Sequence, residues 1–358
     1  MKTGILVLLL VFSLLPASGQ SDTTGISRAD KINFSDNFAL FGSHDLLTMT
    51  IRFDITSFIR KKNKGLYLDG DLTIYSGKGD SITKNVRIKN RGIFRLQYCT
   101  FSPMEIYFKK PMYAYGDSGA IKKIKLGTQC QQSDMFGDYV LKEYLAYRIF
   151  NLFTDTSFRV RLVKVNYIDS GRARKPLQQY GFFIEPVTVM AERINSEVLK
   201  NITITQKSVM PHLMLRLAIF NYMIGNYDWA VPNQHNVAIL KTNDPLADHM
   251  AIAIPHDFDW SGLVNPVYAV PTDDVGIESV RERLYTGICV NRESFRAELL
   301  KFLPLKQKIY SLINNFPYLD PKAKRDMIAY LDEFYCQLEN QKLLESLIDK
   351  LESVCKHL

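Results

Sequence analysis

The hydrophobic pattern of this chain changes its period near residue 136, and that change constrains the fold most strongly. Between Leu47 and Ile55 apolar and polar residues alternate, which is typical of a half-buried strand. From Gly137 to Phe153 the apolar residues are spaced for one face of a helix. Further strands are expected at residues 66–72, 72–75, 86–88, 104–108, 158–168 and 180–184, and further helices at residues 213–224, 324–338 and 341–358. Strands that come first and helices that come last predict an α+β fold with two lobes.

Two of the expected helices have clear end signals. Gly225 should stop the helix at residues 213–224, because glycine readily takes the left-handed conformation that ends a helix. Pro321, directly after Asp320, should begin a later one. Hydrophobic residues make up 46% of the chain and aromatic residues 12%, which is enough for a buried core and excludes a disordered chain.

Residues 1–19 are typical of a secretory signal peptide. Lys2 supplies a positive charge, an apolar run extends from Ile5 to Leu15, and small residues follow at Ala17 and Gly19. The run is shorter than the roughly 20 residues that span a bilayer. We therefore predict an exported protein that is periplasmic, on the cell surface or secreted. It should have a flexible lead-in at residues 20–33 and no transmembrane span after signal cleavage.

Export makes the cysteines relevant, because disulfides form in oxidising compartments. The chain has five cysteines, at Cys99, Cys130, Cys289, Cys336 and Cys355. Their wide spacing excludes a metal motif of the Cys-x-x-Cys kind. One or two disulfides are expected, and the odd number leaves at least one thiol free. Cys99 and Cys130 fall in one predicted lobe, and Cys336 and Cys355 fall on consecutive predicted helices, but the sequence leaves the pairing open.

The net charge of +8 is moderate and spread along the chain. Lysine-rich pieces at residues 60–64 and 122–123 are interpreted as solvated faces. The aromatic residues that single-strand binders place between their basic residues are absent around both pieces. We therefore expect no nucleic-acid partner, whereas an acidic partner or an anionic surface remains open.

Two segments, residues 224–240 and 250–262, carry the polar residues of greatest interest. Each places an aspartate, Asp228 and Asp257, where a helix or strand gives way to a loop. In phosphoryl-transfer sites one aspartate orients the attacking hydroxyl, while an asparagine and a second aspartate hold the metal. Asn, Asp and Pro are also common turn residues. The occurrence of both segments in one chain favours a functional site over two turns.

The two segments resemble motifs of CotH-type proteins, the atypical kinases first known from spore coats. Residues 225–229, Gly-Asn-Tyr-Asp-Trp, with Asn236 after them, are similar to the family's Gly-Asn-x-Asp-Trp…Asn motif. Residues 255–259, Pro-His-Asp-Phe-Asp, are similar to its Pro-Trp-Asp-x-Asp metal motif. Upstream, Arg91-Gly92, residues 138–147 and residues 181–185 follow in the order of the family's other blocks. The resemblance covers roughly residues 85–262.

This resemblance implies an atypical protein-kinase-like fold with two lobes. The β-rich N-lobe with one helix is expected at residues 34–185. The C-lobe with the two aspartate motifs is expected at residues 186–290, and its helical C-terminal part at residues 291–358. The implied activity is transfer of a phosphoryl group from ATP to a hydroxyl of a protein or surface polymer, with Mg²⁺ or Mn²⁺ as the cofactor.

Roles follow for individual residues of the two motifs. Asp228 is expected to be catalytic, because it would accept or orient the proton of the substrate hydroxyl. Asn236, Asp257 and Asp259 are expected to bind the metal, because Mg²⁺ prefers hard oxygen donors. Asn233 is the alternative metal ligand. It lies five residues after Asp228, which is the spacing of kinase loops, whereas Asn236 directly precedes a predicted strand.

Four residues are expected to bind the nucleotide: Arg91, Lys125, Glu143 and Glu185. Lys125 lies on a strand-like run and Glu143 on the following helix, so a lysine–carboxylate pair like that of kinases is expected. Glu185 stands where the resemblance implies the connection between the lobes. The family's Arg-Gly-Asn block reads Arg91-Gly92-Ile93 here, which departs from the pattern.

Two other functions remain open from the sequence. His235 and His256, with Asp257 and Asp259, offer the ligand types of a transition-metal hydrolase. A non-catalytic surface binding or assembly protein is the leading alternative, because exported space is poor in ATP. The sequence does not decide whether the chain is an active enzyme.

Overall fold

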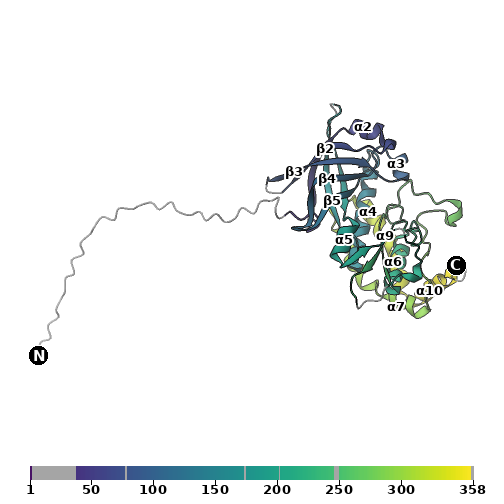
Figure 1. Ribbon diagram of the computed structural model, residues 1–358. Coiled ribbons are helices and arrows are strands. Elements are labelled where there is room, and N and C mark those ends of the chain that lie inside the picture. The colour runs from purple at the N-terminus through teal and green to yellow at the C-terminus, as the bar shows by residue number, and fades with distance from the viewer. Residues whose placement is uncertain (2–37, 77–78, 173–174, 201, 246–249, 356–358) are drawn as a thin grey trace, which may run out of the picture. The chain divides into compact units, whose positions relative to one another are not determined.

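Seven strands from the first half of the chain pair into a closed barrel (Figure 1). The computed structural model describes residues 38–76, 79–172, 175–200, 202–245 and 250–355, together with Met1. The barrel strands are β1 (Leu47–Phe53), β2 (Leu68–Tyr75), β3 (Ser81–Asn90), β4 (Met104–Tyr115), β5 (Ser118–Gly127), β6 (Val160–Asp169) and β7 (Leu177–Ile184). Their order around the barrel is β1-β2-β3-β4-β5-β7-β6. The parallel pair β1 and β6 closes it, and all other neighbours are antiparallel.

Helices dominate the second half of the chain, and three lie before it. In chain order the helices of the described residues are α2 (Ile55–Arg60), α3 (Phe94–Tyr98), α4 (Asp134–Phe153), α5 (Val187–Arg193), α6 (Pro211–Ile224), α7 (Arg292–Leu300), α8 (Lys306–Asn314), α9 (Pro321–Glu339) and α10 (Gln341–Cys355). Short 3₁₀ turns are η1 (Lys62–Lys64), η2 (Gln206–Ser208), η3 (Asp273–Val275) and η4 (Leu303–Leu305). The fold is therefore α+β, with a β-rich N-terminal region and a helical C-terminal region, as the sequence predicts. The short helices α2, α3 and α5 were not predicted from the sequence.

The first strand confirms the alternating pattern and corrects its end. Every second residue of β1 from Leu47 to Phe53 is buried in the barrel core. The strand stops before Ile55, because the carboxylate of Asp54 accepts a hydrogen bond from the Ser57 amide at 2.7 Å and caps α2. The local capping bond therefore places Ile55 in a helix, although the alternating pattern assigns it to the strand.

Helix α4 connects the barrel to the helical region. It packs against β6 and β7 of the barrel and against α8, and most of its residues are buried. Its apolar side chains belong to the large core that also contains residues of α6, α9 and α10. A second core fills the barrel. Two polar residues of α4, Lys142 and Glu143, are buried as well, which is unusual for charged groups without a specific role.

A small second sheet carries the two sequence segments of interest. It consists of β8 (Ser196–Val198), β9 (Val237–Thr242) and β10 (Ala251–Pro255), in the order β10-β9-β8. Because β9 and β10 pair with Val237 opposite Pro255, the loop before β9 meets the loop after β10. The His256 amide donates to the carbonyl of Asn236 at 2.9 Å, and the Gly262 amide donates to the carbonyl of Gly225 at 3.1 Å. The two segments are thus joined at both ends.

Both expected helix ends are confirmed. Gly225 ends α6 in the left-handed conformation with φ = 66°. Asp320 caps α9, because its carboxylate accepts from the Lys322 amide at 2.7 Å, and Pro321 is the first residue of the helix.

Two disulfides are formed. Cys99 pairs with Cys130, and Cys289 pairs with Cys355. Cys336 is free and exposed, so the odd cysteine count is explained. Cys355 therefore joins the α10 end to the segment before α7, and not to its neighbouring helix α9.

The described residues from Phe38 onward belong to one compact unit. The expected signal peptide at residues 1–19 and lead-in at residues 20–33 lie outside the described residues, apart from Met1. Within the described ranges, no helix combines the length and the apolar character that crossing a bilayer requires.

We expect Gly225→Ala to destabilise the protein by about 2–5 kcal/mol. The left-handed backbone costs an L-residue about 1–2 kcal/mol. The added Cβ would also overlap the buried hydroxyl of Tyr330, which adds about 1–3 kcal/mol of overpacking. Gly276→Ala is the matched control, because Gly276 has φ = 77° and nothing within 4 Å of the added Cβ. It should cost about 1–2 kcal/mol.

Urea denaturation of both variants measures this difference. Tyr330→Phe in the Gly225→Ala background should recover part of the loss. The Tyr330 hydroxyl has no hydrogen-bond partner among the described residues, so removing it forfeits no bond. Equal destabilisation of Gly225→Ala and Gly276→Ala would contradict the steric argument.

Candidate functional site

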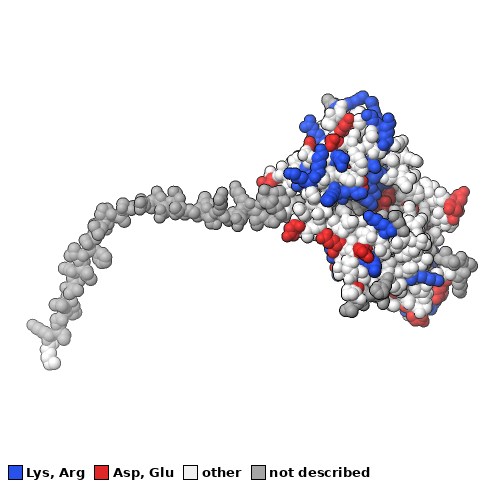
Figure 2. Space-filling view, in the orientation of Figure 1, with Lys and Arg blue, Asp and Glu red and all other residues white. Residues whose placement is uncertain are grey.

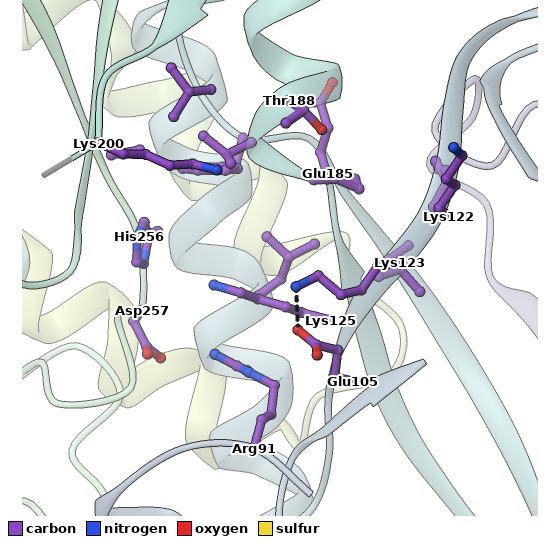
Figure 3. Close-up of a pocket in the computed structure, with 18 of the residues that line it drawn as sticks. Arg91, Glu105, Lys122, Lys123, Lys125, Glu185, Thr188, Lys200, His256 and Asp257 are labelled. Carbon is purple, nitrogen blue, oxygen red and sulfur yellow. Dashed lines mark ion pairs between the residues drawn. The ribbon is translucent and has the colours of Figure 1, made fainter. Parts of the chain in front are cut away.

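Two cavities meet between the barrel and the small sheet. The first has a volume of about 460 Å³, and four lysines, Lys122, Lys123, Lys125 and Lys200, line it (Figure 3). We call it the lysine-lined cavity. The second has a volume of about 630 Å³. Because Phe94 and Trp260 line it, we call it the aromatic-lined cavity. Four residues line both, so the two cavities are continuous: Arg91, Gln234, His256 and Asp257.

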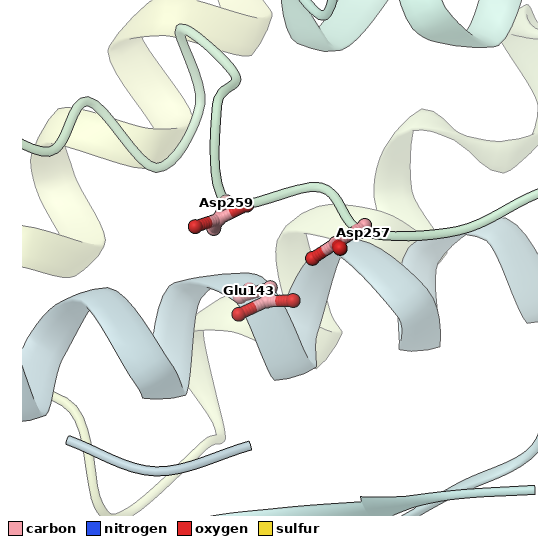
Figure 4. Close-up of side chains that lie close together, drawn as sticks. All are labelled: Glu143, Asp257 and Asp259. Atoms are coloured by element: carbon pink, nitrogen blue, oxygen red, sulfur yellow. The ribbon is translucent and has the colours of Figure 1, made fainter. Parts of the chain in front are cut away.

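Three carboxylates gather below this junction. Glu143 projects from α4, and Asp257 and Asp259 lie on the loop after β10, with ligand oxygens within 4.8 Å of one another (Figure 4). We call them the acidic cluster. Glu143 is 3% exposed and Asp259 is 5% exposed. Arg95 is their counter-charge, since its Nη1 lies 3.7 Å from Glu143 and 3.6 Å from Asp259.

Burial and mutual repulsion perturb these carboxyl groups. Burial raises the pKa of Glu143 well above its usual range, and the charge of Asp259 adds to the effect. Burial and the charge of Asp257 raise the pKa of Asp259 to about 7, although Arg95 acts in the other direction. For Asp257, burial would raise the pKa, but positive charges, Arg91 foremost, outweigh burial and lower it. Glu143 and Asp259 therefore ionise less readily than free carboxyl groups, whereas Asp257 ionises more readily.

The backbone around Asp257 is specialised. Asp257 has φ = 63°, in the left-handed region where aspartate and asparagine are tolerated best after glycine. Its amide donates to the hydroxyl of Tyr147 at 2.8 Å. Tyr147 lies one turn after Glu143 on the same face of α4. This contact fixes the aspartate loop against the helix that carries the third carboxylate.

Asp228 lies at the mouth of the aromatic-lined cavity with its carboxylate held by two neighbours. One oxygen is 2.7 Å from Nε2 of His235, and the other accepts from Nδ2 of Asn236 at 3.0 Å. The Asn236 side chain also donates to the Asp228 carbonyl at 2.7 Å. The oxygen of Asn233 accepts from the His235 amide at 3.1 Å, so this exposed residue acts as a turn former. Of the two asparagines, Asn236 is the one joined to both aspartate segments.

Positive charge faces Asp257 across the junction. Arg91 and Lys125 point into the lysine-lined cavity opposite Asp257 and His256 (Figure 3). The Lys125 side chain reaches solvent through the cavity, and protein atoms surround the rest of it. This partial burial of the ammonium group and the charge of Arg91 lower the pKa of Lys125 to about 8. The space-filling view shows further Lys and Arg side chains on the barrel surface (Figure 2).

Two expected roles change in the structure. Lys125 and Glu143 form no ion pair within the described residues, because Glu143 faces Arg95 and the other two carboxylates instead. The Glu185 side chain lines the lysine-lined cavity, but its carboxylate is hydrogen-bonded to other residues of the protein. It accepts from Tyr115 at 2.6 Å, from the Arg159 amide at 2.9 Å and from Arg193 at 3.0 Å. Its carboxylate therefore ties the end of β7 to α5.

The histidine-containing metal site is not assembled among the described residues. The group that could hold a metal contains carboxylates alone. His235 contacts Asp228, as described above. Burial and the charge of Lys125 lower the pKa of His256 to about 3, so its imidazole is neutral.

Sequence reasoning missed several residues of the site. Tyr147 has a detectable pattern, because it lies four residues after Glu143 on one helix. The hydroxyl of Tyr268 donates to Asp259 at 3.1 Å, and Lys200 enters the lysine-lined cavity from the segment after β8. The sequence around Tyr268 and Lys200 contains no pattern that predicts a role in the site. Both residues lie on loops, whose residues follow no regular spacing.

Comparisons with known proteins add little to this geometry. No protein-family model matches the chain, and no curated protein matches it. Among solved structures, the chain is similar to the crystal structure of the Helicobacter pylori proinflammatory kinase CtkA. The two are 11% identical, and the alignment covers 77% of this chain and 91% of that chain with a TM-score of 0.36. A TM-score this low supports no argument about fold or function. The resemblance to CotH-type proteins stays a prediction.

The raised pKa of Asp259 predicts a pH dependence of stability in metal-free protein. A carboxyl with a folded pKa near 7 stays protonated while its unfolded form, near 3.8, has ionised. Asp259 therefore lowers the free energy of unfolding progressively from about pH 4 to about pH 7, by at most about 1.4 kcal/mol per pH unit. The difference in melting temperature, Asp259→Asn minus wild type, should become more positive between about pH 5 and about pH 8.

The measurement is thermal unfolding in the presence of a chelator. Groups such as His256 titrate in both proteins, so the difference reports Asp259 together with its effect on Glu143. Asp274→Asn, on an exposed turn, is the matched control and should show a constant difference across the range. A constant difference for Asp259→Asn would refute the assigned direction.

Proposed function

We propose that this protein is a divalent-metal-dependent phosphotransferase with a kinase-like division into a β-rich and a helical lobe. It would transfer a phosphoryl group from a nucleotide such as ATP to a hydroxyl of a protein or surface polymer. One observation carries the proposal. The lysine-lined cavity and the aromatic-lined cavity meet at Asp257, which belongs to the acidic cluster. Asp228 lines the aromatic-lined cavity, where the acceptor would bind.

The acidic cluster suits a hard divalent cation. Glu143, Asp257 and Asp259 supply carboxylate oxygens close enough for one ion to contact all three, and such oxygens suit Mg²⁺ or Mn²⁺. The raised pKa of Asp259 supports the fit, because a bound cation would relieve the repulsion that raises it. Asn236 would complete the set from the neighbouring loop. When bound, the metal would neutralise charge on the transferring phosphate.

The lysine-lined cavity suits a nucleotide. Arg91 and Lys125 would hold phosphate oxygens beside Asp257, and Lys122, Lys123 and Lys200 surround the opening. Apolar and aromatic side chains also line it, including Phe158, Ile184 and Val187, which a base could contact. Catalysis of phosphoryl transfer rests on positioning and charge stabilisation, and both are available here.

Asp228 would orient the acceptor hydroxyl and take its proton. Its two hydrogen-bonded neighbours, His235 and Asn236, hold the carboxylate in one orientation. Such positioning converts an encounter into a reaction of oriented groups. The predicted export of the chain is part of the proposal, and an extracellular or surface hydroxyl would then be the acceptor.

A non-catalytic binding protein is the second candidate, and one observation favours it. Arg95 already lies within 3.7 Å of both Glu143 and Asp259 and balances part of their charge without a metal. A chain that partly balances its cluster in this way could use the same cavities for binding alone. The two candidates differ in whether a metal and a nucleotide bind together.

Asp257→Asn should abolish the joint stabilisation by nucleotide and metal. A ligand that binds only the folded state, at about a hundred times its dissociation constant, stabilises it by about 2.7 kcal/mol. Asparagine is chosen because it tolerates the left-handed backbone of Asp257, whereas alanine would add strain. Thermal shifts with ATP, Mg²⁺ or Mn²⁺, alone and together, measure the effect, with Asp274→Asn as control. A wild-type protein without any joint shift would exclude the phosphotransferase and leave the binding protein.

Asp228→Asn should separate binding from chemistry. The variant keeps the size of the side chain but cannot accept a proton, so nucleotide binding should persist. Phosphoryl transfer, including slow nucleotide hydrolysis, should fall by about 10²- to 10⁴-fold. Release of labelled phosphate from the γ-position measures it. An unchanged rate in Asp228→Asn would exclude Asp228 as the base.

A further inference from the structure

One wall of the aromatic-lined cavity consists of an exposed ring, that of Phe94, and a half-buried ring, that of Trp260. Phe94 of α3 and Trp260 lie edge to face, with ring centroids 5.2 Å apart and an interplanar angle of 89°. Phe94 is 39% exposed, and Ile93 beside it is 88% exposed. The buried ring of Tyr268 lies 5.8 Å from Phe94 and supports it from below. A rigid aromatic surface at a cavity wall offers a face for stacking at little entropic cost.

Polar side chains form another part of the lining. They follow Asp228 along one loop and are Asn233, Gln234, His235 and Asn236. Their amide groups offer both donors and acceptors. Hydroxyl groups have the same double character. This lining is therefore complementary to a molecule with several hydroxyls.

Charge excludes an anionic acceptor. No lysine lines the aromatic-lined cavity within the described residues, whereas four line its neighbour. Its two arginines, Arg91 and Arg95, face the carboxylates of the acidic cluster. The positive charge of the site thus lies on the side proposed for the nucleotide, and the acceptor side is close to neutral.

The backbone argues against an extended peptide. The residues that line this cavity come from segments 91–95, 103, 228–236 and 256–260, all outside the strands β1 to β10. Peptides that bind as an added strand need an unpaired strand edge. No described part of this lining presents one.

We propose that the aromatic-lined cavity binds a neutral glycan, and that a sugar hydroxyl is the acceptor. A sugar ring would stack its C–H face on one of the two rings, Phe94 or Trp260, which stand at 89° to each other. Its hydroxyls would bond the amide groups of Asn233 and Gln234. The transfer step rests on the proposed function. The sugar oxygen forms a bond to the γ-phosphorus, the bond from that phosphorus to the β–γ bridging oxygen breaks, Asp228 takes the hydroxyl proton, and a nucleoside diphosphate leaves.

Tryptophan fluorescence tests the binding step directly. The chain has two tryptophans, and Trp229 is 5% exposed in the core, so Trp260 is the residue that a ligand in the cavity would contact. Titration uses neutral hexasaccharides of glucose, mannose and N-acetylglucosamine. We expect a saturable change of emission with at least one of them, and its loss in Trp260→Phe.

Variants that keep both tryptophans measure the affinity. Phe94→Ala should weaken binding about tenfold, the equivalent of one lost stacking contact. Tyr113→Ala is the matched control, because Tyr113 is 43% exposed on the barrel strand β4 and does not line this cavity. Its affinity should equal that of the wild type. Equal affinity of Phe94→Ala and wild type would overturn the stacking surface.

The test separates this inference from the proposed function. Glycan binding without any joint shift by nucleotide and metal supports the glycan site and excludes phosphotransfer. A joint nucleotide and metal shift without a saturable response to any of the hexasaccharides overturns the glycan site and keeps the phosphotransferase. Phosphorylation of a serine-containing peptide library under those conditions would identify a protein acceptor in its place.

Discussion

The pairing of two loop segments through their backbones is the constraint on which the site depends. Gly225 ends α6, and the Gly262 amide donates to its carbonyl, while β9 and β10 join the opposite ends of the same segments. Tyr330 packs its hydroxyl against both glycines, so neither position has room for a side chain. Asp228 and Asp257 share one junction because these bonds leave their loops no other arrangement.

Burying the acidic cluster costs free energy, because its carboxylates leave water and lie close to one another. Glu143 and Asp259 are buried, and a single guanidinium, that of Arg95, pairs with both of them. Removing charges from water costs several kcal/mol per ion unless partners compensate, so folding alone gives no reason to keep such a group. A cation bound at the cluster would supply the missing charge. The same imbalance accounts for the raised pKa values of Glu143 and Asp259.

Local features of the fold could be predicted, and long-range features could not. The alternation in β1, the glycine stop at Gly225 and the cap at Asp320 depend on residues close in sequence, so their patterns are visible there. Closure of the barrel depends on the pairing of β1 with β6, more than a hundred residues later in the chain. Registers between distant strands depend on the packing of both faces, which no single segment encodes.

The same division holds for the candidate site. The sequence by itself identified Asp228, Asn236, Asp257 and Asp259, because short motifs preserve the order in which a loop presents polar groups. Only the tertiary structure decided that Glu143 joins these aspartates and faces Arg95 instead of Lys125. The tertiary structure also decided that Glu185 forms an ion pair with Arg193. The physical reason is that partners of buried charges are chosen by burial and distance in space, and neither quantity is written in local sequence.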